Sequence, residues 1–199
     1  MYPRYLLPCY KNQLLNEVLS QAKEAVETIK REDEKEYINI VDAMEVVNAV
    51  CKGKDKIETC ADIKKSFLKK ISKKLEKYQQ GRIAFDEYKE GSLKDQTRAK
   101  RLGDVKAIEF DVTDETHLKV IGMNVFLSHV KTKAKLVTYL GSALVEEYEH
   151  SNYPLIVVYN ETVYTNSAAE KYTSLSTHSH EEADTLIPLL LKDIADTHP

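Results

Sequence analysis

The stretch "YINIVDAMEVV", residues 37–47, decides the fold class that we assign to this chain. Its opening residues, among them Tyr37, Ile38 and Val41, are strong β-formers, and Asp42 then interrupts the apolar run. A near-continuous apolar run of this length is typical of a buried strand in a parallel sheet. We therefore expect a strand here that delivers one carboxylate, that of Asp42, at its carboxyl end.

The rest of the chain alternates between strand-like and helix-like segments. Further strands are predicted at "RIAFDEY" (82–88), which ends on Asp86, and at "PLIVVYN" (154–160). Helices are predicted over 57–81, where Thr59 and Asp62 can form a capping box, over 91–101 and 128–149, and from His180 onward. Short strands or extended pieces are predicted at 107–112 and 117–122. "ETVYT" (161–165) either forms a hairpin with the strand before it or continues as a loop. This order predicts an α/β domain of three layers around a mostly parallel central sheet.

We place the α/β domain at residues 37–199 and expect residues 1–36 to form an N-terminal helical extension. Composition is that of a soluble globular protein, with 42% hydrophobic and 31% charged residues. The net charge of −3 provides no long-range attraction to nucleic acid. Three cysteines without framework spacing favour reduced thiols, and no apolar run reaches the roughly 20 residues of a membrane span. We expect an intracellular protein, cytoplasmic or nuclear, without a membrane partner.

Two of the predicted strands end on an aspartate, Asp42 and Asp86. Ligand sites of open parallel sheets form at the carboxyl ends of strands. Two carboxylates there repel each other unless a cation lies between them, and oxygen ligands suit Mg²⁺ or Mn²⁺. Glu182 and Asp184 open the last predicted helix close to such an edge. The sequence therefore predicts a metal site, although Glu182 also completes a capping box with Ser179.

Other interpretations remain open for two charged segments. The lysines between 64 and 77 form either a solvated helix face or a patch that binds phosphates. His178 and His180 could bind zinc, but the sequence offers no further pair of ligands. Nucleophilic catalysis and nucleotide-cofactor chemistry are not indicated, since the chain has no GxSxG, Walker or GxGxxG motif.

Three segments in order carry a resemblance to a known family. "NIVDAM" (39–44), "IAFDEYKEGSLKDQTRAKR" (83–101) and "SHEEADTLI" (179–187) resemble the flap endonucleases, or XPG-type 5′ nucleases, and the wider PIN-like superfamily. Uncharacterised animal proteins with similar "SLKD" and "SHEEADT" motifs look closer still. The matched acidic positions are Asp42, Asp86, Glu182 and Asp184. The matched basic positions are Lys94 and Arg101.

The resemblance implies a site with two Mg²⁺ or Mn²⁺ ions that hydrolyses phosphodiester bonds of DNA or RNA. The four acids would hold the ions directly or through water. Lys94, Arg98 and Arg101 would orient the phosphate and offset the charge of the transition state. Nucleic acid is thus the implied partner, and the oligomeric state is left open.

The chain departs from the family pattern at its carboxyl end. In the family, a strand with a further pair of aspartates follows the acidic helix, whereas this chain ends at Pro199. We therefore expect a sheet that lacks one strand, an incomplete two-metal site, and weak or absent hydrolysis. The alternative is a nucleic-acid-binding or scaffold module without catalysis, which kept the fold and lost the site.

Overall fold

The structure is a computed structural model. The chain divides into two compact units, Met1–Glu36 and Tyr37–Pro199, and the fold described below is that of the second unit. The residues described are 37–53, 56–89, 91–92, 108–119, 121–175 and 183–197. The predicted helical extension at 1–36 lies outside them.

Four strands form a single sheet in the order β1-β2-β3-β4. Their bounds are β1 Ile38–Asp42, β2 Gln80–Ala84, β3 Leu155–Tyr159 and β4 Thr162–Thr165. β2 pairs in parallel with both β1 and β3, and β4 pairs antiparallel with β3. The predicted α/β class with a mostly parallel sheet is therefore confirmed. Within the described residues, β1 has a neighbouring strand on one side only.

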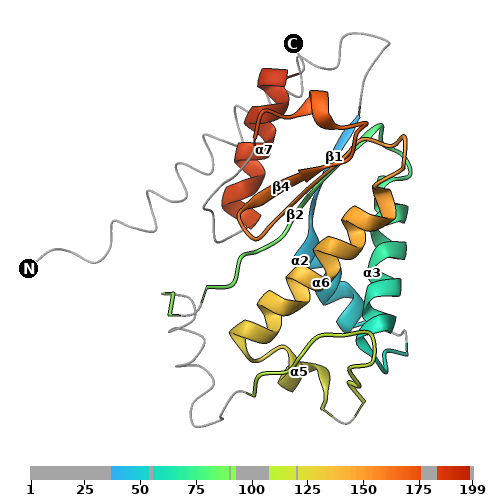
Figure 1. The fold of residues 1–199 in the computed structure, drawn as a ribbon, viewed down its shortest axis with the longest axis vertical. Helices are drawn as coiled ribbons and strands as arrows, with labels where there is room; N and C mark the ends of the chain where they lie inside the picture. Colours follow the sequence, from blue (N-terminus) through green and yellow to red (C-terminus); the bar gives the residue numbers. More distant parts are fainter. Residues whose placement is uncertain are drawn as a thin grey trace, which may run out of the picture. The chain divides into compact units, whose positions relative to one another are not determined.

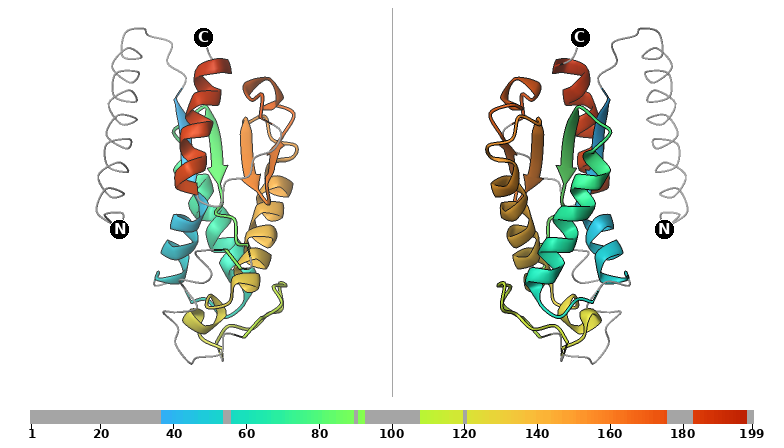
Figure 2. Two further views of the ribbon diagram at one scale, coloured as in Figure 1. Left: turned by 90° about the vertical axis from the view of Figure 1, so that its left-hand side faces the viewer. Right: turned by 90° about the vertical axis from the view of Figure 1, so that its right-hand side faces the viewer.

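Helices cover both faces of the sheet (Figures 1 and 2). The α-helices are α2 Ala43–Cys51, α3 Cys60–Leu75, α5 Met123–Phe126, α6 Val130–Tyr148 and α7 Ala183–Thr197, with a 3₁₀ turn, η1, at Glu170–Tyr172. α3 and α6 lie on one side of the sheet, and α7 packs on β1 and β2 from the other. This arrangement is compatible with the expected three layers.

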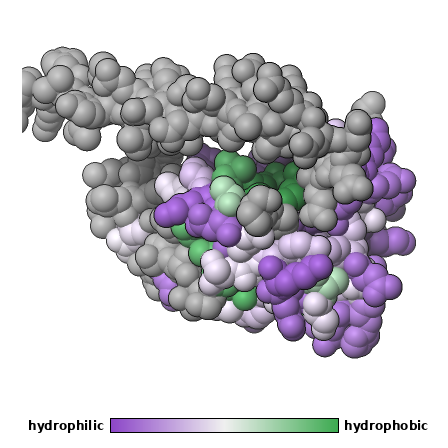
Figure 3. Space-filling view, turned by 90° about the horizontal axis from the view of Figure 1, so that it is seen from above, coloured by the Kyte–Doolittle hydropathy of each residue, from purple (hydrophilic) through white to green (hydrophobic). Residues whose placement is uncertain are grey.

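The described surface is largely hydrophilic when it is seen from above, with a small group of hydrophobic residues (Figure 3). No helix in the described ranges is both long and apolar enough to cross a membrane.

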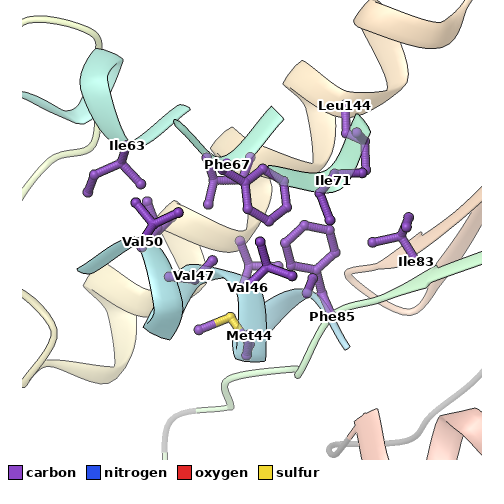
Figure 4. Close-up of a cluster of buried hydrophobic side chains, with 14 of the residues drawn as sticks. Met44, Val46, Val47, Val50, Ile63, Phe67, Ile71, Ile83, Phe85 and Leu144 are labelled. Atoms are coloured by element: carbon purple, nitrogen blue, oxygen red, sulfur yellow. The ribbon is translucent and has the colours of Figure 1, made fainter. Parts of the chain in front are cut away.

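Alternate residues of the strands build one core on each face of the sheet. Leu155 and Val157 of β3 point into the core beneath α2, α3 and α6, whereas Ile156 and Val158 point into the core beneath α7. In the first core, Phe67 of α3 meets Phe85, which follows β2, with ring centroids 5.9 Å apart (Figure 4). The sheet is thus buried on both faces, as its apolar strands predicted.

α3 begins with the capping box that the sequence predicts. The Thr59 side chain accepts a hydrogen bond from the Asp62 backbone, and the Asp62 carboxylate accepts one from Thr59 N–H at 3.0 Å. The expected stop at Gly81 is wrong, because α3 ends at Leu75 and Gly81 belongs to β2. A Cβ at Gly81 would lie 2.7 Å from Cδ2 of Leu75, so a larger residue there would force the end of this leucine side chain to shift.

The first strand ends at Asp42, as expected, but helix α2 follows it at once, and the sequence analysis did not predict that helix. The described parts of 107–112 and 117–122 are extended pieces, and their one β-bridge joins His117 to Thr59. The alternative left open at 161–165 is decided for a hairpin, with Asn160 and Glu161 at positive φ as in a type I′ turn.

Candidate functional site

Three of the four predicted metal ligands lie within the described residues. Asp42 is the last residue of β1, Asp86 follows β2 by two residues, and Asp184 lies in the first turn of α7. β1 and β2 are parallel, so their carboxyl ends share one edge of the sheet. Glu182 lies outside the described residues, as do Lys94, Arg98 and Arg101 and the zinc candidates His178 and His180.

Asp42 ends the strand and starts the next helix at the same time. Its Oδ1 accepts hydrogen bonds from the backbone N–H groups of Met44 at 2.7 Å and Glu45 at 3.2 Å. These are orphan donors of the first turn of α2, so Asp42 is the N-cap of that helix. The carboxylate is therefore held in a fixed place at the strand end.

Asp86 joins β2 to the start of α7. Its Oδ1 accepts a hydrogen bond from the backbone N–H of Ala183 at 2.8 Å, across 97 residues of sequence. Its Oδ2 is 3.4 Å from the hydroxyl of Tyr88, at the outer limit of a hydrogen bond. This contact brings the first turn of α7, and Asp184 with it, to the carboxyl end of β2.

The three aspartates influence one another electrostatically. Burial raises the pKa of Asp42 most, and the negative charges of Asp86 and Asp184 raise it further. The backbone hydrogen bonds from Glu45 and Met44 oppose the rise without cancelling it. The ionised form of Asp42 is thus disfavoured, as expected for a carboxylate that shares a site with like charges.

The described acids do not form a closed ligand cluster. Over the ranges that the structure describes, no group of three or more His, Cys, Asp or Glu residues is close enough to hold a metal ion. Asp42 also caps α2, and Asp86 also accepts a hydrogen bond from the first residue of α7, structural roles that the sequence prediction did not include. The arrangement places carboxylates from three parts of the chain at one edge of the sheet.

A buried ion pair beneath α7 was missed by sequence reasoning. Arg82 of β2 donates from Nη1 to Oδ2 of Asp193 at 2.6 Å, with side chains 0% and 2% exposed. Arg82 also donates to the carbonyl oxygens of Leu190 at 3.2 Å and Tyr172 at 2.6 Å. Its position inside an apolar strand was the available signal, since a buried charge requires a partner. The Arg82–Asp193 ion pair holds α7 against β2 and thereby helps to position Asp184 in the first turn of α7.

The described cysteines offer no reactive thiol. Burial raises the pKa of both Cys51 and Cys60 to about 11, so both stay protonated at neutral pH. A protonated thiol is neither a nucleophile nor a metal ligand.

Comparisons of the chain with protein-family models, with curated proteins and with solved structures found no match.

Proposed function

We propose that residues 37–199 form a PIN-like, nuclease-type domain that binds DNA or RNA and hydrolyses phosphodiester bonds weakly with Mg²⁺ or Mn²⁺. The observation that carries the proposal is the convergence of Asp42, Asp86 and Asp184 at the carboxyl ends of two parallel strands. These aspartates come from three elements and are far apart in sequence. Stability alone does not require three acids in such a place, because their charges repel.

The oxygen donors of these aspartates are of the chemical kind that suits a hard divalent cation. All three donors are carboxylate oxygens, which Mg²⁺ and Mn²⁺ prefer. Both hydrogen bonds of Asp42 go to Oδ1, and within the described residues no donor occupies its Oδ2. A cation near Oδ2 would offset the charges of Asp86 and Asp184 that raise the pKa of Asp42.

Each residue then has a separate task. Asp42 and Asp184 would hold the ion, with Glu182 as the predicted fourth acid. Asp86 would hold the ion through Oδ2 while its Oδ1 fixes the start of α7. A bound ion would lower the pKa of a water molecule and polarise the phosphate. Lys94, Arg98 and Arg101 stay predictions for orienting the phosphate.

A second candidate function is nucleic-acid binding without catalysis. It is favoured by the structural roles of two of the acids, since Asp42 caps α2 and Asp86 accepts a hydrogen bond from the first residue of α7. The lack of a closed ligand group in the described ranges favours it as well. This candidate predicts salt-sensitive binding that does not depend on metal.

Metal-dependent stabilisation separates the two candidates. We expect Mn²⁺ to raise the melting temperature of the full chain and of the Asp196→Asn control, an exposed acid of α7. Asp42→Asn should lose most of this shift while α2 stays capped, since asparagine is an equally good N-cap. An Mn²⁺ shift that persists in Asp42→Asn and Asp184→Asn would contradict the metal site.

Cleavage is measured with end-labelled single-stranded DNA, flapped DNA and RNA. We expect slow Mg²⁺-dependent hydrolysis that Asp86→Asn abolishes, because the amide retains the oxygen that accepts from Ala183 but loses the charge. If Asp86→Ala cleaved as fast as the unaltered chain, the assignment would be wrong. Binding without any cleavage would favour the second candidate.

A further inference from the structure

A groove between the carboxyl-terminal halves of α3 and α6 has no role in the acidic site. It is an open surface groove with a volume of about 430 Å³. Its lining includes Lys69, Ser72, Lys73, Tyr78, Tyr148 and Tyr153. A neighbouring hollow of about 340 Å³ shares Lys69, Ser72 and Tyr148 with it, so the two form one continuous α3–α6 groove.

The α3–α6 groove lies at the opposite end of the sheet from the aspartates. Leu75, on its wall, ends the helix that precedes β2, and Tyr153 comes just before β3. Asp42 and Asp86 follow β1 and β2. Five-residue strands separate the two ends by about 15 Å. A ligand of the groove is therefore distinct from one at the acidic edge.

Lysines without acidic partners line one side of the groove. Lys69 and Lys73 form no ion pair with any carboxylate of the described residues, whereas Lys64 pairs with Asp114 at 2.7 Å. Their spacing of four residues along α3 places them about 6 Å apart on one face. This is close to the separation of successive phosphates in an extended single strand.

Tyrosines supply the other side of the groove. Tyr148 and Tyr153 meet edge to face with centroids 6.1 Å apart, and Tyr78 remains 37% exposed. The hydroxyl of Tyr153 is out of contact with solvent and has no hydrogen-bond partner among the described residues.

We propose that the α3–α6 groove binds single-stranded nucleic acid, with phosphates on Lys69 and Lys73 and a base stacked on Tyr78 or Tyr148. Charged grooves with aromatic side chains are the general design of sequence-independent single-strand binding. Glu76 and Glu147 also line the groove and reduce its attraction for phosphate, but Lys65 adds a third positive charge. This inference rests on the proposed nucleic-acid function and makes its substrate more specific.

Binding in EDTA tests the groove without the acidic site. A fluorescent oligothymidylate is titrated with the full chain at several salt concentrations, and binding is followed by anisotropy. Lys69→Ala with Lys73→Ala should lower the slope of log affinity against log salt by about 1.4, since each phosphate contact in a single strand contributes about 0.7. Tyr78→Ala should weaken binding by about tenfold.

Two controls keep the outcome unambiguous. Lys52→Ala with Lys192→Ala removes the same charge from exposed positions outside the groove and should leave the salt slope almost unchanged. Asp196→Asn, an exposed acid outside both the groove and the acidic edge, should bind as the unaltered chain does. If both lysine double variants lowered the salt slope equally, or if the chain did not bind the oligonucleotide in EDTA, the proposed groove would be wrong. Neither result would bear on the Mn²⁺ melting experiment.

A crosslinking experiment locates the strand directly. Oligonucleotides that carry 5-iodouracil should crosslink to peptides containing Tyr78 or Tyr148 when EDTA is present. Crosslinks confined to other peptides would refute the groove.

Discussion

Replacing Asp193 by asparagine tests how α7 is held on the sheet. The change keeps an oxygen that can accept from Ser174, whose N–H and hydroxyl lie 3.0 and 2.9 Å from Oδ1. It removes the charge opposite Arg82, which is fully buried. Breaking one side of a buried pair costs about 3–5 kcal/mol, because the remaining charge is left without compensation.

We expect Asp193→Asn to lie at the lower end of that range, about 3 kcal/mol. The guanidinium of Arg82 keeps two carbonyl partners, the oxygens of Leu190 and Tyr172. For a chain of this length, a loss of about 3 kcal/mol lowers the melting temperature by roughly 6–12 °C. Such a loss is a large part of the 5–15 kcal/mol that typically stabilises a domain.

Urea unfolding followed by circular dichroism measures the free energy of unfolding of each variant. Asp196→Asn, an exposed position on the same helix, should change it by less than about 0.5 kcal/mol. Arg82→Met combined with Asp193→Leu removes both charges and should stay close to the unaltered chain. A loss below about 1 kcal/mol in Asp193→Asn, or a larger loss in the double variant, would refute the reasoning.

Three further outcomes are expected from unfolding measurements. Thr59→Ala should cost about 1 kcal/mol by removing the N-cap of α3, whereas Thr59→Ser should not. Gly141→Ala should cost about 1 kcal/mol despite better helix propensity, since its Cβ would lie 2.7 Å from Cδ1 of Tyr159; a gain in stability would contradict this packing. Although burial raises the pKa of Asp193, hydrogen bonds from Ser174, Thr173 and Arg82 lower it overall. Its contribution should persist at neutral pH and be lost as pH falls below about 4, with a shallower loss in Asp193→Asn.

Local sequence patterns were sufficient to predict those helices and strands whose formation depends mainly on their own residues. The capping box of Thr59 and Asp62 and the apolar run at 155–159 predicted α3 and β3 without reference to other parts of the chain. They also placed aspartates at two strand ends, since alternation of strands and helices implies a parallel sheet. Local patterns failed at 43–51, where an apolar segment suits either a strand or a helix.

The sequence by itself determined the α/β class, the mostly parallel sheet and the acids at the ends of β1 and β2. Only the tertiary structure decided what those acids contact, because Asp86 meets Ala183 across 97 residues and Arg82 meets Asp193 across 111. The same holds for the α3–α6 groove, whose lysines and tyrosines come from two helices, the segment after α3 and the loop before β3. The hydrophobic periodicity of a segment predicts which of its faces is buried. Which distant side chains then contact each other depends on how the helices and strands pack together.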